Sequence, residues 1–181
     1  MNGFLLIKPD EDHRQEIHDY RREFLDEGSP FHGDTGLQHF EDVSEWIDYC
    51  RRHEHEETVP EGRAVGEQYM LVREGDSRIL GMISLRPYLN DYLAEHAGHI
   101  GYGVRPSERR KGYATLMLSM GLDRCREHGL ESVLLVCLPE NQPSRRTIVA
   151  CGGVFERMTI GGEEVMERYW ISLGDAEPVR A

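Results

Sequence analysis

Residues 104–114, VRPSERRKGYA, lead into a segment whose apolar residues recur with helical spacing. Arg109, Arg110 and Lys111 therefore stand at a helix start, where the peptide dipoles make each cation unfavourable by about 0.3–1 kcal/mol. No Ser, Thr, Asp or Asn stands directly before Gly112 to cap the exposed N–H groups. A bound phosphate would supply both the cap and the negative charge, so the stretch predicts an anion site. A solvated basic loop is the alternative.

The segments on either side of this stretch predict a crossover unit. Residues 99–104, HIGYGV, read as a strand, residues 112–128 as a helix and residues 132–138, SVLLVCL, as a buried strand. We expect the two strands of this β-α-β unit to be parallel neighbours. Gly101 and Gly103 leave one face of the first strand bare, which is typical of a close approach by another backbone or a ligand.

The rest of the chain extends this unit to an α/β fold with the order β-α-α-β-β-β-α-β-α-β-β. Further strands are predicted at 4–9, 67–74, 78–87, 154–160 and 165–173, and further helices at 11–27, 40–50 and 141–153. We expect one domain over residues 1–173 and a frayed tail at 174–181.

Charge and cysteine usage limit the classes of partner. The 181 residues carry a net charge of −12, which argues against broad binding to nucleic acid or an anionic membrane. The four cysteines form no C-x-x-C pair, so reduced thiols in a cytoplasm are expected. The first residues lack the pattern of a signal peptide, and the longest apolar run, 133–138, is too short to cross a bilayer.

The motif at the helix start carries a resemblance to a known family. Residues 109–114, RRKGYA, match the pattern [QR]-x-x-G-x-[GA] of the GNAT N-acetyltransferases, and Asn141-x-x-Ser144 follows the next strand as that family's Asn-x-x-[SA] often does. The order of elements is similar over about residues 3–173. The resemblance implies the GNAT fold, a mixed central sheet of about seven strands flanked by about four helices, and acetyl-CoA as cofactor.

The resemblance also implies which residues hold coenzyme A. The backbone N–H groups of Arg109, Arg110, Lys111, Gly112, Tyr113 and Ala114 would bind its pyrophosphate. The main chain of Tyr102, Gly103 and Val104 would pair with the pantetheine arm, and an N–H of this strand would polarise the acetyl carbonyl. Asn141 and Ser144 would contact the pantetheine side. From the residues alone, Asn141 reads equally as a helix N-cap and Ser144 as an ordinary first-turn serine.

The implied reaction is direct attack by a primary amine on the thioester. An amine like that of lysine costs about 4.6 kcal/mol to deprotonate at pH 7, so a base is needed. His99 is the candidate base, with a histidine that only hydrogen-bonds as the alternative. Many family members carry a Tyr as acid seven residues after the Asn, where this chain has Ile148. Tyr102 is a candidate catalytic acid in its place, and Tyr169 and Cys151 are others.

The acceptor is expected beside the 29–36 loop and the helix at 40–50, by analogy with the family. This region is acidic, which makes it a candidate site for a small cationic amine; a solvated helix face is the alternative. The acidic residues are Asp34, Glu41, Asp42, Glu45 and Asp48. No metal site is expected, and a homodimer is an expected assembly because members of the family are often dimers. The missing tyrosine leaves a non-catalytic acyl-CoA sensor as the second hypothesis.

Overall fold

The computed structural model describes residues 3–161 and 164–174. Its seven strands are β1 (Phe4–Ile7), β2 (Glu67–Arg73), β3 (Gly81–Leu85), β4 (Ile100–Val104), β5 (Ser132–Cys137), β6 (Val154–Gly161) and β7 (Glu164–Ser172). Its α-helices are α1 (Arg14–Asp26), α2 (Val43–His53), α3 (Asp91–His96), α4 (Tyr113–Glu127) and α5 (Gln142–Ala150). Short 3-10 turns lie at Glu11–His13, Leu37–His39 and Pro106–Glu108. The predicted α/β class and every predicted strand and helix are therefore confirmed.

One helix was not predicted from the sequence. Residues 90–98 were interpreted as a plain connection, but Asp91–His96 forms α3. The Asn90 side chain accepts a hydrogen bond from the N–H of Leu93 and so caps this helix. A single short turn of helix gives too few residues for a periodic pattern, which is why the sequence did not indicate it.

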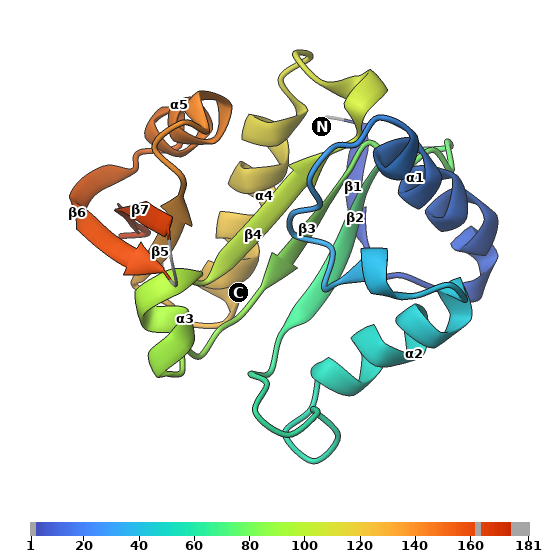
Figure 1. The fold of residues 1–181 in the computed structure, drawn as a ribbon, viewed down its shortest axis with the longest axis horizontal. Helices are drawn as coiled ribbons and strands as arrows, with labels where there is room; N and C mark the ends of the chain where they lie inside the picture. Colours follow the sequence, from blue (N-terminus) through green and yellow to red (C-terminus); the bar gives the residue numbers. More distant parts are fainter. Residues whose placement is uncertain (1–2, 162–163, 175–181) are drawn as a thin grey trace, which may run out of the picture.

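The strands form two sheets rather than one (Figure 1). The larger sheet has the order β1-β2-β3-β4 and the smaller sheet has the order β5-β7-β6, and all pairs within them are antiparallel. The two strands of the predicted β-α-β unit, β4 and β5, therefore lie in different sheets and form no ladder with each other. The two strands meet where β4 begins, through an isolated bridge between Gly98 and Leu135.

A side chain explains why this contact does not continue as a ladder. The N–H of His99 donates to the carbonyl of Leu134 over 2.8 Å, as a strand pair would. The N–H of Leu134, however, donates to Nδ1 of the His99 ring over 2.9 Å. Since an imidazole takes the donor that a neighbouring strand would use, β4 continues only along β3.

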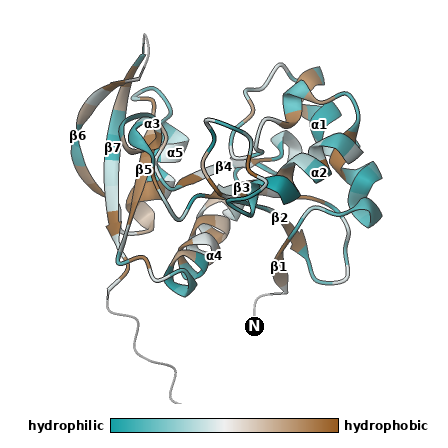
Figure 2. Cartoon of the chain, turned by 90° about the horizontal axis from the view of Figure 1, so that it is seen from below, coloured by the Kyte–Doolittle hydropathy of each residue, from teal (hydrophilic) through white to brown (hydrophobic). Residues whose placement is uncertain are grey.

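Two apolar clusters hold the layers together. Helices α1 and α2 pack on one face of the larger sheet, where Tyr20 and Trp46 contact the side of Met70 and Met82. Helix α4 packs on the other face, in a cluster that also takes in residues of β5 and β7. Figure 2 shows the smaller sheet lying beside the larger one, with α4 below their junction. The second cluster therefore joins the two sheets into one core.

The ends of the chain are described only in part. The apolar cluster that joins the sheets includes Leu6 near one end and Leu173 near the other. Of the tail expected at 174–181, residues 175–181 lie outside the described residues. None of the helices in the described part combines the length and the apolar character that a bilayer span requires.

Candidate functional site

The first turn of α4 leaves its backbone donors free. Gly112 is the N-cap residue, with φ of +84°, and no side chain caps the helix there. Within residues 3–161 and 164–174, no protein group accepts a hydrogen bond from the N–H groups of residues 112–115. A Cβ added at Gly112 would meet no atom within 4 Å, so the space in front of these donors is open. Unpaired N–H groups therefore lie where the sequence predicts an anion site.

The three predicted cations are not equivalent. Lys111 donates from Nζ to Glu108 over 2.9 Å, and this contact holds the pKa of Glu108 below its ordinary value. The Arg109 guanidinium donates to the Val104 carbonyl and to Ser29 Oγ, each over 3.2 Å. Arg110 is exposed and has no hydrogen bond or ion pair to another described residue. The sequence interpretation gave all three side chains one role, whereas only Arg110 is uncommitted.

Arg110 also adopts a strained backbone conformation. Its φ is +62°, a left-handed value that an arginine reaches at a cost of about 1 kcal/mol or more. The next residue but one, Gly112, is left-handed as well. Together these turns carry the chain from Pro106–Glu108 into α4 with the backbone of the loop exposed. Strain at a loop that presents free donors is typical of a binding site.

The side chain of Tyr113 points away from the free donors. Its hydroxyl accepts a hydrogen bond from Nη2 of Arg73 over 2.7 Å, and its ring lies 5.6 Å from the ring of Phe4. Ala114 is small and half-buried. These two predicted site residues therefore offer a ligand their backbone and not their side chains.

Strand β4 is the edge strand of the larger sheet and carries the second set of free donors. Two backbone hydrogen bonds to β3 and its flanks fix its alternation: the N–H of Arg105 donates to the carbonyl of Leu80, and the carbonyl of His99 accepts from the N–H of Arg86. In an antiparallel pair every second residue bonds to the neighbouring strand. The main-chain groups of Tyr102 and Val104 therefore face the open edge, as predicted for a partner of pantetheine. Those of Gly103 face β3.

The bare face of β4 is filled by the chain itself. A Cβ on Gly103 would lie 2.5 Å from the carbonyl oxygen of His32, and a Cβ on Gly33 would lie 2.4 Å from Gly101 O and Tyr102 Cα. The loop after α1 thus crosses β4 in backbone contact. The sequence left open whether another backbone or a ligand approaches these glycines, and in the structure it is the backbone of this loop.

Asn141 and Ser144 meet at the start of α5. Oδ1 of Asn141 accepts the N–H of Ser144 over 3.1 Å, so the N-cap reading of Asn141 is confirmed. The Tyr102 hydroxyl lies 3.0 Å from Ser144 Oγ, which links β4 to α5. Burial raises the pKa of Tyr102 to about 12, so its phenol keeps the proton at pH 7.

His99 occupies a structural position. Its Nδ1 accepts the N–H of Leu134, and its ring lies edge-on to Trp170. Burial, with the charge of Arg86, lowers the pKa of His99 to about 4. A base of that strength with one nitrogen occupied is poorly suited to deprotonate an ammonium near pH 7. The geometry therefore favours the alternative weighed for His99, a histidine that hydrogen-bonds.

The positions considered for a catalytic acid differ in what surrounds them. Ile148 is fully buried in the apolar core, so no acid replaces the family's tyrosine at that position. Tyr169 is buried and donates to Glu167 over 2.8 Å. Cys151 points its Sγ toward the carbonyl of Thr115, 3.8 Å away. Of the three substitutes, Tyr102 alone lies on the strand with the free donors.

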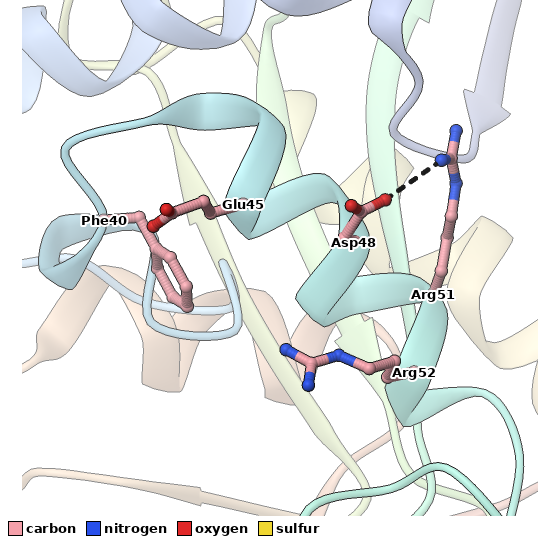
Figure 3. A pocket seen from close by; sticks show the side chains of 5 residues that line it. All are labelled: Phe40, Glu45, Asp48, Arg51 and Arg52. Atoms are coloured by element: carbon pink, nitrogen blue, oxygen red, sulfur yellow. Dashed lines mark hydrogen bonds and ion pairs between the residues drawn. The ribbon is translucent and has the colours of Figure 1, made fainter.

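The acidic residues expected to hold a cation are dispersed. Asp34 is buried and accepts the N–H groups of Gly36 and Leu37. Asp42 caps α2 and contacts Arg14. Figure 3 shows Glu45 and Asp48 on α2 lining a surface hollow together with two arginines, and Asp48 is ion-paired with one of them. This hollow includes no residue of β4 or of the start of α4.

His32 is a candidate base that the sequence reasoning missed. It lies in the loop that crosses β4, with its backbone against Gly103. His32 is exposed, yet partial desolvation by the surrounding protein lowers its pKa below the ordinary value, so the imidazole is neutral near pH 7. Its ring has no hydrogen-bond partner among the described residues. Only the crossing of the loop over β4 indicates this residue, and the sequence contains no local signal for that crossing.

Comparison with known proteins assigns this arrangement to a family. The family model "Acetyltransferase (GNAT) family" matches residues 32–152, about two thirds of the chain. The chain belongs to this family. The match includes β4, the loop at 109–114, α4 and α5. Acetyl-CoA is the co-substrate of GNAT acetyltransferases, so the question is whether the free N–H groups suit this ligand. Phosphate oxygens fit unpaired N–H groups at a helix start.

Individual relatives agree with this assignment. The chain is 30% identical over 94 residues to the Uncharacterized N-acetyltransferase YnaD of Bacillus subtilis, a match that covers 48% of this chain and 54% of the relative. The chain thus spans about half the length of that curated relative. Ribosomal-protein-S5-alanine acetyltransferase from Vibrio fischeri has the same fold, with a TM-score of 0.69 at 16% identity over 98% of this chain and 97% of that one.

A second solved structure shows the same fold. Mycobacterium smegmatis RimJ in complex with CoA-disulfide has a TM-score of 0.66 and 21% identity, covering 93% of this chain and 81% of that chain. Identities this low establish the fold and not the acceptor.

Proposed function

We propose that the protein transfers an acetyl group from acetyl-CoA to a primary amine of a small molecule. The observation that carries the proposal is the uncapped start of α4, where the N–H groups of residues 112–115 have no protein acceptor. A helix start of this kind in a GNAT sequence is suited to the pyrophosphate of coenzyme A. Arg110 would add a charge-assisted hydrogen bond.

The remaining cofactor contacts come from β4 and α5. The open-edge N–H groups of Tyr102 and Val104 and the carbonyl of Tyr102 would pair with the amides of pantetheine, as a neighbouring strand would, whereas the carbonyl of Val104 already accepts from Arg109. The N–H2 group of Asn141 stays available for the same arm, because its cap uses only Oδ1. Bound acetyl-CoA would supply a thioester, which is an activated acetyl donor.

The chain's own residues would then handle charge and protons. The N–H of Tyr102 would stabilise negative charge on the acetyl oxygen, a contribution of about 3 kcal/mol when one such donor is removed. The phenol of Tyr102, which keeps its proton, would donate a hydrogen bond to the departing thiolate. We assign the base to His32 in place of His99, because its ring is neutral and has no partner among the described residues.

We retain a primary amine as the acceptor but do not assign it a further positive charge. Structural neighbours include spermidine N-acetyltransferase SpeG from Vibrio cholerae, at 14% identity with a TM-score of 0.63. Three of the five acids that suggested a cationic acceptor, Asp34, Asp42 and Asp48, bind backbone N–H groups or pair with arginines, so the acids support no particular cation. The reaction requires only one amine on the acceptor. That amine is an ammonium in solution and must lose a proton before it attacks.

The experiment is an assay of free thiol released from acetyl-CoA with a panel of primary amines. The proposal expects turnover, a His32→Gln variant with kcat lowered about 100-fold, and a His99→Gln variant whose loss follows its loss of stability. Tight acetyl-CoA binding without thiol release for any amine would instead identify the acyl-CoA sensor, which the buried Ile148 favours.

A further inference from the structure

Arg86 follows β3 and is half-buried, and its surroundings differ from those of the buried arginines Arg105 and Arg168. Arg105 donates to Glu23 over 2.5 Å and also to Glu16. Arg168 donates to Glu156 over 2.8 Å. Among the described residues, no carboxylate lies within ion-pair distance of Arg86, and its buried Nε has no hydrogen-bond partner. A guanidinium that is partly removed from water without an anion is costly, so this arrangement points to a ligand.

The guanidinium lies over β4 beside the proposed reaction site. A Cβ built on Gly101 would be 3.2 Å from Nη2 of Arg86 and 3.3 Å from Oγ of Ser84. The same point is 3.4 Å from Cα of Gly33, in the loop that also carries His32. The spot is thus lined by a cation, a hydroxyl and backbone. The next residue along β4 is Tyr102, whose N–H faces the open edge.

We propose that Arg86 binds a carboxylate of the acceptor, so that the acceptor amine belongs to an amino acid. This inference rests on the proposed function and names its substrate class. A guanidinium offers two parallel N–H donors that match the two oxygens of a carboxylate, and the Ser84 hydroxyl adds a third donor.

The spacing favours an amine close to the carboxylate. Gly101, the Arg86 contact point, is adjacent to Tyr102 in the chain, and consecutive Cα atoms are about 3.8 Å apart. In an amino acid the amine and the carboxylate are likewise only a few bonds apart. A carboxylate held at Arg86 would place the amine near the strand position whose N–H is free, and near His32.

The charge of Arg86 persists despite its burial. Burial lowers the pKa of Arg86 to about 10, which leaves the guanidinium protonated at pH 7. Interaction with the Tyr92 phenol opposes this shift, and among the described residues no carboxylate forms an ion pair with Arg86. A carboxylate ligand would therefore meet an uncompensated positive charge.

The test is a binding comparison on the protein saturated with CoA. Calorimetric titrations would use the standard amino acids, their C-terminal amides and spermidine as probes. We expect at least one amino acid to bind tenfold or more tighter than its amide, and Arg86→Met to remove that preference. Arg63→Met is the matched control, because Arg63 is exposed, lies on a loop and has no ion pair to a described residue.

Stability separates a ligand-binding arginine from a structural one. Replacing a buried, unpaired cation by Met relieves desolvation, so the melting temperature of ligand-free Arg86→Met is expected to equal or exceed that of the wild type. Arg86→Lys keeps the charge without the paired donors and should lose most of the preference, which keeps the test open if the Met variant does not fold.

The outcomes are decisive and separable from failure of the proposed function. Equal binding of acids and amides, binding of neither, or an unchanged preference in both Arg86 variants would overturn the carboxylate assignment. An amine turned over regardless of a carboxylate would do the same while leaving acetyl transfer intact. Carboxylate-dependent binding without any thiol release would support Arg86 and contradict the transferase.

Discussion

Helices α4 and α5 both begin near β4: α4 packs against this strand, and the start of α5 contacts the Tyr102 hydroxyl through Ser144. Their first turns are nevertheless built differently. At α5 the Asn141 side chain accepts the Ser144 N–H, and Pro143 removes one further donor. Helices α2 and α3 are capped in the same way, by Asp42 and Asn90. At α4 no side chain caps the turn.

This difference supports the proposal that the start of α4 binds a ligand. Helix α1 also lacks a side-chain cap, but a 3-10 turn whose own start is capped by Asp10 leads directly into it. A missing cap costs about 1 kcal/mol, and the left-handed Arg110 adds a similar strain. The α5 start is satisfied by the protein and needs nothing more. The start of α4 destabilises the free protein, and a bound anion would stabilise it.

The largest effect is expected from Gly112→Asp. An added carboxylate would lie beside the free N–H groups and repel the pyrophosphate, so acetyl-CoA affinity should fall at least 100-fold, or about 2.7 kcal/mol. Gly129→Asp is the control, because Gly129 has a φ of +78° and open space at the other end of α4. Calorimetric titration measures both, and equal affinity for wild type and Gly112→Asp would mean that the site lies elsewhere.

Arg110→Gly is expected to separate stability from binding. Glycine adopts the left-handed conformation freely, so the ligand-free variant should gain about 1 kcal/mol in its free energy of unfolding. Loss of the charge-assisted bond should weaken acetyl-CoA binding about tenfold. Lys111→Met should weaken it less, since Glu108 already engages Lys111. Denaturant unfolding and titration report the two effects, and a variant that loses stability would refute the strain argument.

Asn141→Ala is expected to lower stability, whereas Arg110→Gly is expected to raise it. Removing the cap of α5 should lower the free energy of unfolding by about 1 kcal/mol, a factor of about five in the folding equilibrium. Asn141→Asp keeps an acceptor for the Ser144 N–H and should restore stability. Chemical denaturation compares the three proteins. A neutral Asn141→Ala would show that α5 does not depend on this cap.

Salt is expected to give the smallest effect. The free donors and Arg110 are exposed, so their attraction to phosphate is screened as the Debye length shrinks. Acetyl-CoA affinity should weaken about threefold between 0.1 and 0.5 M salt. The unfolding free energy lost in Asn141→Ala should not change over the same range. Affinity that rises with salt would contradict a phosphate-dominated site.

Local patterns in the sequence predicted the parts of the site that lie on one segment. The basic stretch before Gly112, the helix after it and the Asn141 cap each depend on neighbours in the chain, and each was predicted. The ion pair between Lys111 and Glu108 was missed, although an i,i+3 spacing could have indicated it.

Features that depend on distant segments were not predicted. The division into two sheets follows from the His99 ring taking the Leu134 N–H, across 35 residues of sequence. The glycines of β4 are needed because the loop at His32 crosses that strand. Arg86 has no carboxylate partner among the described residues, and its Nε has no hydrogen-bond partner there. No sequence pattern indicates this, because the neighbours of Arg86 come from distant segments.

The central claim is that the free N–H groups at the start of α4 are the phosphate site, and amide NMR tests it residue by residue. On addition of CoA to ¹⁵N-labelled protein, the amides of residues 112–115 should show the largest shifts and become protected from hydrogen exchange. The amide of Ser144, already bonded to Asn141, should keep its protection. Binding that leaves the amides of residues 112–115 unshifted and exchanging would contradict the account.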